Sequence, residues 1–158
     1  WLRIGGIINK CIRITEGKMP LSAYADNSSF KVYMLDCGLL CSKFDIAANV
    51  IIDSPHSFAG FKGALAENYI MQALVSNGIK PYYWSSQGKA ELDFVFQDTQ
   101  GNIIPLEAKS SENVRSKSLK TFINSYDVPY AIRVSAKNFG FENNIKSIPL
   151  YAVFCLTI

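Results

Sequence analysis

The sequence predicts an α/β (α+β) domain in which a mixed central sheet is flanked by helices. From about residue 60 the pattern of apolar residues follows the order helix, strand, strand, strand, helix, strand, which is typical of helices layered on one sheet. Two alternating runs, at residues 91–97 and 103–109, are separated by turn-forming residues and predict a hairpin. With 49% hydrophobic and 13% aromatic residues among 158, the chain can bury a sizeable core.

The first part of the chain differs in composition and in its pattern of apolar residues. Residues 7–14 form a short apolar segment, and a loop rich in Gly, Pro, Asp and Asn follows it. Residues 30–35 alternate and lead into Asp36 and a short predicted helix. Residues 49–60 contain Asp53, Ser54, Pro55 and His56 and are predicted to be a loop or linker.

Residues 60–76 predict an amphipathic helix, because apolar side chains recur there at spacings of three and four. Asn77 and Gly78 form a suitable C-terminal stop. An aromatic strand candidate follows at residues 81–84.

The hairpin is predicted in more detail. In its first strand, alternation assigns Leu92, Phe94 and Phe96 to one face and Glu91, Asp93 and Val95 to the other. Residues 98–102 form the turn. In the second strand one face holds Ile104, Leu106 and Ala108, and the other holds Ile103, Pro105, Glu107 and Lys109. A helix at 116–125, a strand at 130–135 and one or two short elements from residue 145 complete the prediction.

The hairpin carries the candidate chemistry. If the turn centres near Gln100, Asp93 lies opposite Glu107 and Glu91 lies opposite Lys109; a bulge at Gly101 would change this register. Like charges about 5 Å apart destabilise a sheet unless something neutralises them. Magnesium does so, since it is commonly held by one or two carboxylates plus water. An ammonium group two residues after Glu107 can stabilise charge that develops on a phosphate.

Two alternatives remain open for these acids. Glu67 falls toward the packed side of its helix, where it either points at the same metal site or pairs with a lysine or solvent. Asp93, Glu107 and Lys109 either share a site or belong to a solvated strand face. Lys89 and Glu91 are interpreted as surface charges.

Composition narrows the function classes. A net charge of +3 neither demands nor excludes a polyanionic partner. The basic residues Lys109, Arg115, Lys117 and Lys120 favour either a polyanion or a solvated helix face. The four cysteines form no CxxC pair and the single histidine has no partner at a ligand spacing, which argues against structural zinc and favours thiols in a reducing compartment.

The sequence shows neither a signal-peptide pattern nor a membrane-spanning pattern. The chain opens with Trp1 and shows no signal-peptide pattern, so we expect a processed protein or a piece of something longer. Its longest apolar run, residues 150–158, is far shorter than the roughly 20 residues that span a bilayer. The prediction is a soluble, cytoplasmic protein without a membrane partner.

Four stretches, residues 30–40, 61–69, 83–94 and 104–109, together resemble a known family. They are similar to the C-terminal domain of unknown function attached to prokaryotic AAA-type ATPases, and the resemblance covers nearly the whole chain. It implies a PD-(D/E)XK nuclease-like domain with a restriction-endonuclease-like core at 46–158. Residues 1–45 would then be the end of a winged-helix segment and its connector.

The resemblance also implies a site and partners. It assigns Glu67, Asp93, Glu107 and Lys109 as catalytic residues, with Asp93 and Glu107 as Mg²⁺ ligands. Leu92 stands where the nuclease motif often has proline. The implied partners are DNA or RNA and an N-terminal ATPase module. ATP is not expected to bind this fragment, since it contains no GxxxxGK[ST] run.

Three functions are therefore weighed. The first is a magnesium-dependent phosphodiesterase acting on DNA or RNA. The second is a non-catalytic module that binds nucleic acid or protein and works with the ATPase. The third is an architectural domain whose acidic hairpin is inherited.

Overall fold

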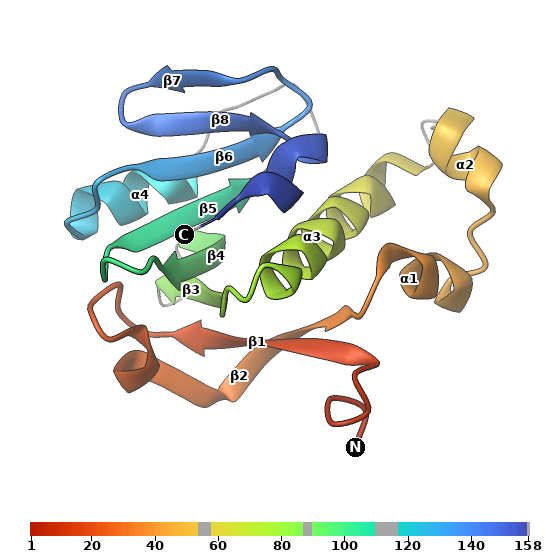
Figure 1. Ribbon diagram of the computed structural model, residues 1–158, viewed down its shortest axis with the longest axis horizontal. Coiled ribbons are helices and arrows are strands. Elements are labelled where there is room, and N and C mark those ends of the chain that lie inside the picture. Colours follow the sequence, from red (N-terminus) through yellow and green to blue (C-terminus); the bar gives the residue numbers. More distant parts are fainter. Residues whose placement is uncertain (54–57, 87–89, 110–116, 158) are drawn as a thin grey trace.

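The computed structural model describes residues 1–53, 58–86, 90–109 and 117–157, and it has a mixed α/β fold (Figure 1). In these ranges eight strands form one mixed sheet, in the order β2-β1-β3-β4-β5-β6-β8-β7. The strands are β1 (Ile8–Ile14), β2 (Ala25–Met34), β3 (Tyr82–Ser86), β4 (Ala90–Gln97), β5 (Ile103–Ala108), β6 (Ala131–Ser135), β7 (Gly140–Glu142) and β8 (Ile145–Pro149). The helices are α1 (Cys37–Lys43), α2 (Ala48–Asp53), α3 (Ala59–Ser76) and α4 (Lys117–Ser125), with 3-10 turns η1 (Leu21–Tyr24) and η3 (Leu150–Cys155).

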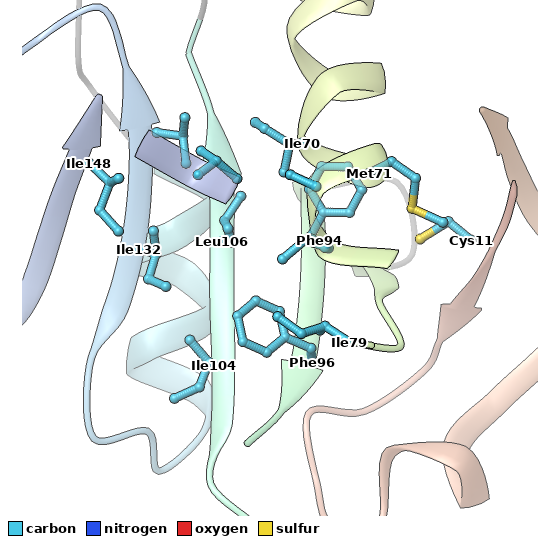
Figure 2. Packing of buried hydrophobic residues seen from close by; sticks show 14 of the residues in the cluster. Cys11, Ile70, Met71, Ile79, Phe94, Phe96, Ile104, Leu106, Ile132 and Ile148 are labelled. Carbon is cyan, nitrogen blue, oxygen red and sulfur yellow. The ribbon is translucent and has the colours of Figure 1, made fainter. Parts of the chain in front are cut away.

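The longest helix, α3, covers one face of the sheet (Figure 1). Its Ile70 and Met71 pack with Phe94 and Phe96 of β4 and Leu106 of β5, as Figure 2 shows. All five side chains are at most 1% exposed. Burying this many large apolar groups is the main force that holds the helix on the sheet.

The opposite face is covered by α4. Leu119 and Phe122 of this helix are fully buried and pack with Trp84, Leu92 and Ile103. The rings of Phe122 and Trp84 meet edge to face, with centroids 5.2 Å apart. The sheet is therefore a middle layer with a helix on each side.

The predicted helix at residues 60–76 is confirmed as α3, together with its stop. Gly78 has a φ of 75°, a left-handed conformation that costs glycine little. Within the described ranges, no helix combines the length and the apolar character needed to cross a bilayer.

The predicted hairpin register is also confirmed. Phe94 pairs with Leu106, Val95 with Pro105 and Phe96 with Ile104, so each pair is symmetric about residue 100. The side chain of Asp98 fixes the turn by accepting hydrogen bonds from the backbone amides of Gln100 at 2.9 Å and Asn102 at 2.8 Å. This pairing ends at Phe94 and Leu106, one residue before Asp93 and Glu107.

The predicted faces of β4 are wrong at one position. Leu92 packs on the α4 side with Val95, whereas Phe94 packs on the α3 side. The cause is an irregularity in the pairing with β3: Trp84 pairs with Leu92 and Tyr82 with Val95, which leaves an extra residue on β4. Alternation is interrupted at Asp93.

Two further elements differ from the sequence-based expectation. Residues 48–53, predicted to belong to a loop, form the helix α2, whereas residues 54–57 lie outside the described residues. The short edge strand β7 was not predicted.

The N-terminal strands join the same sheet as the rest of the chain. β1 runs antiparallel to β2 and parallel to β3, with Ile12 paired to Tyr82 and Ile14 to Trp84. A domain boundary near residue 45 and a winged-helix segment before it stay predictions.

Candidate active site on the β4–β5 hairpin

Asp93 lies at the centre of the candidate site. Its Oδ2 accepts a hydrogen bond of 2.8 Å from the backbone amide of Ala108 on β5. Burial and then the negative charges of Glu67 and, more weakly, Glu107 raise the pKa of Asp93 to about 7, against the opposing effects of the Ala108 amide and Lys31. A carboxylate in this setting gains from a nearby cation.

Glu107 is the most deeply buried acid of the predicted site, at 3% exposure. Its Oε1 forms an ion pair of 2.9 Å with the Nζ of Lys109. Its Oε2 is buried and has no hydrogen-bond partner in the described part of the chain. Because Leu106 and Ala108 pack toward α3, strand alternation directs Glu107 to the other face.

Glu67 reaches the site from α3. Its Oε2 accepts a hydrogen bond of 3.1 Å from the Tyr33 hydroxyl and lies 3.9 Å from the Nζ of Lys31. The same ammonium group is 2.6 Å from Oε1 of Glu91. Glu67 therefore has both features that the sequence left open: it pairs with a lysine, and its charge acts on Asp93.

Asp93 is influenced both by Glu67, which comes from α3, and by Glu107, which alternation directs away from α3. This carboxylate interacts electrostatically with Glu67 on one side and Glu107 on the other, and Glu107 holds Lys109. Among the described residues, no three His, Cys, Asp or Glu side chains are grouped closely enough to form a metal-ligand set.

Two of these residues carry oxygens of the chemical type that magnesium prefers. This cation takes hard oxygen ligands and usually keeps several waters, so that one or two carboxylates suffice. The open Oε2 of Glu107 and the carboxylate of Asp93 are oxygens of this kind. Burying a carboxylate oxygen without a partner is costly, and a bound cation would remove that cost.

Sequence reasoning missed the contribution of β2. Lys31 and Tyr33 come from the alternating run at residues 30–35, which was read only as a strand. Glu91, interpreted as a surface charge, has a 53% exposed side chain but pairs with Lys31. Alternation shows which face a residue takes and says nothing about partners from distant strands. Lys89 and Arg115 lie outside the described residues.

A groove borders this site. It has a volume of about 540 Å³, and its lining includes Lys31, Tyr33, Gly60, Gly63 and Glu67. A second groove, of about 600 Å³, runs between α1, α2 and α3 and is mostly apolar. None of the four predicted site residues lines it, whereas Glu67 alone among the four lines the first groove.

Comparison with known proteins gives one match. The model of a family described as a domain of unknown function (DUF4143) matches residues 62–153. No curated protein and no solved structure matches the chain. The matched range contains Glu67, Asp93, Glu107 and Lys109, whereas Lys31 and Tyr33 precede it.

Proposed function

We propose, from the premise that this chain belongs to the family described as a domain of unknown function (DUF4143), that it is a nuclease-like domain that hydrolyses phosphodiester bonds of DNA or RNA with magnesium. One observation carries the proposal. The half-buried carboxylate of Asp93 is flanked by the charges of Glu67 and Glu107, and Glu107 keeps one buried oxygen open.

Each residue has a role in this proposal. Asp93 and Glu107 would hold the cation, and Glu67 would tune or share it. The cation would act as a Lewis acid on a phosphoryl oxygen. Lys109 would use its ammonium group to stabilise charge that develops on the phosphate or to position the attacking water. The amide of Ala108 fixes Asp93 in place.

We also propose the class and the context. The order supports a PD-(D/E)XK nuclease-like domain: Glu67 lies on a helix, Asp93 on the first hairpin strand and Glu107 on the second, with Lys109 directly after that strand. In a longer protein this domain would work with an AAA-type ATPase module, which would supply the ATP site.

A non-catalytic role is the second candidate. It is favoured by the ion pairs that already neutralise the acids, Lys109 with Glu107 and Lys31 with Glu67. A domain of this kind would bind nucleic acid or protein and work with the ATPase without cutting.

A cleavage assay separates the two. The protein is incubated with magnesium and single-stranded DNA, duplex DNA or RNA, beside Asp93→Asn and the matched variant Asp127→Asn, which changes an exposed aspartate. The proposal expects the unaltered protein and Asp127→Asn to cut and Asp93→Asn to lose at least about 100-fold of the rate. Binding without cutting favours the non-catalytic role, and cutting that survives in Asp93→Asn contradicts the assigned site.

A further inference from the structure

Lys31 reaches the acidic cluster from the far edge of the sheet. It belongs to β2, the edge strand, yet its Nζ lies 2.6 Å from Oε1 of Glu91 on β4 and 3.9 Å from Oε2 of Glu67 on α3. Its side chain is only 26% exposed. A long flexible side chain in this position gives up rotamer freedom, so its placement needs a compensating interaction.

The backbone beside Lys31 is held in place. Asn68 of α3 is 1% exposed, and it accepts a 2.8 Å hydrogen bond from the Met34 amide and donates a 3.3 Å bond to the Met34 carbonyl. The Tyr33 hydroxyl bonds to Glu67 at 3.1 Å. Contacts of α3 with Lys31, Tyr33 and Met34 therefore hold β2 in place beside the site.

Three carboxylates interact electrostatically with the ammonium group of Lys31. Glu67, Glu91 and Asp93 all act on its ammonium group. Glu91 and Asp93 belong to β4, which carries one of the proposed cation ligands, and Glu67 belongs to α3, which packs on β4. A divalent cation at Asp93 and Glu107 would therefore interact with the same carboxylates as the ammonium group of Lys31.

We propose that Lys31 is the built-in counter-ion of this site, that Glu91 holds its ammonium group at 2.6 Å and within 3.9 Å of Glu67, and that this positive charge opposes the binding of a divalent cation there. This inference rests on the proposed function, because it assumes that a cation binds beside Asp93. It makes Lys31 a positioning residue that sets metal affinity. It also makes β2, which precedes the family-matched range, part of the functional unit.

The test is a calorimetric titration of Mn²⁺ into the intact chain and the variant Lys31→Gln. Removing a positive charge near a dication strengthens the dication's binding, so we expect at least about tenfold higher affinity in Lys31→Gln. Lys31→Arg keeps the charge and should stay within about threefold of the unaltered protein.

Lys80→Gln is the matched control. Lys31 and Lys80 each lie 5.3 Å from the centroid of a tyrosine ring, Tyr83 and Tyr82 respectively, but Lys80 is exposed. We expect it to leave the Mn²⁺ affinity unchanged. Equal or weaker Mn²⁺ binding in Lys31→Gln than in the unaltered chain would overturn the inference.

Glu91→Gln provides a second, opposite readout that does not depend on Lys31→Gln folding. Without Glu91 the ammonium group loses its 2.6 Å partner and is free to move onto Glu67, so Mn²⁺ affinity should fall by about three- to tenfold. The same change should have less effect when combined with Lys31→Gln, since no ammonium group then remains to move onto Glu67. Equal effects in both backgrounds would contradict the inference.

Failure of this inference can be told apart from failure of the proposed function. If the unaltered chain binds Mn²⁺ and Lys31→Gln binds it no better, only the role of Lys31 is wrong. If neither protein binds Mn²⁺, both the metal site and the role of Lys31 are wrong.

Discussion

The carboxylate of Asp93 accepts a hydrogen bond of 2.8 Å from the backbone amide of Ala108, on the neighbouring strand. Ala108 stands between Glu107 and Lys109, so this bond fastens the first acid to the segment that carries the second acid and the amine. The hairpin register, symmetric about residue 100, pairs the two strands up to Phe94 and Leu106, directly before these residues. Four predictions follow from this arrangement.

Asp93 makes stability depend on pH. Its pKa is about 7 in the folded protein and near 3.8 when unfolded, so between these values the folded state binds a proton that the unfolded state has released. This contribution to stability is present at pH 4 and is lost as pH rises through 7. In the unaltered protein this group should lower the free energy of unfolding by roughly 2–4 kcal/mol between pH 4 and pH 8, and Asp93→Asn should abolish that decrease. Urea unfolding at both pH values measures it, and an unchanged pH slope in Asp93→Asn would contradict it.

Lys109 should stabilise Glu107. Lys109→Met removes the 2.9 Å ion pair and leaves a glutamate side chain that is only 5% exposed without its ammonium partner. We expect a loss of about 1–3 kcal/mol in the free energy of unfolding. Lys120→Met, which changes an exposed lysine of α4, serves as the control and should have little effect. A Lys109→Met protein as stable as this control would show that the pair contributes nothing.

Asn68 should hold β2 on α3. Asn68→Ala breaks both hydrogen bonds to Met34 and leaves the Met34 backbone without these partners. The expected cost is about 2–4 kcal/mol, measured by thermal or urea unfolding. Asn124→Ala, at an exposed position of α4, is the matched comparison. Equal stability of the two variants would rule out this role.

Turn chemistry explains why the hairpin could be predicted from the sequence. Asp98 and Gly101 stand where a tight turn needs a side-chain acceptor and a positive φ, and Gly101 indeed has a φ of 87°. Once the turn is fixed, the pairing of β4 with β5 follows residue by residue. The pairing of the two strands up to Phe94 and Leu106 was therefore within reach of local reasoning.

The side of the sheet taken by Leu92 could not be predicted in the same way. It depends on an irregularity between β4 and β3, in which Trp84 pairs with Leu92 and Tyr82 with Val95. The helix α2 was missed because Asp53, Ser54 and Pro55 dominate the local composition, although the preceding residues are helical.

The electrostatic surroundings of the site were also beyond the sequence. Lys31 and Glu67 are 36 positions apart and meet only because β2 packs on α3. Periodicity indicated that Glu67 lies near the packed side of its helix. It could not identify Tyr33, whose hydroxyl donates to Glu67, or Lys31, whose ammonium group lies 3.9 Å from it.

The central claim, that Asp93 and Glu107 together hold a divalent cation, is tested most directly by Mn²⁺ binding followed by electron paramagnetic resonance. The account predicts one saturable site in the unaltered chain, at least about tenfold weaker binding in Asp93→Asn and in Glu107→Gln, and no change in Glu142→Gln, which alters an exposed glutamate of β7. Absence of Mn²⁺ binding by the unaltered chain, or equal binding by all four proteins, would contradict it.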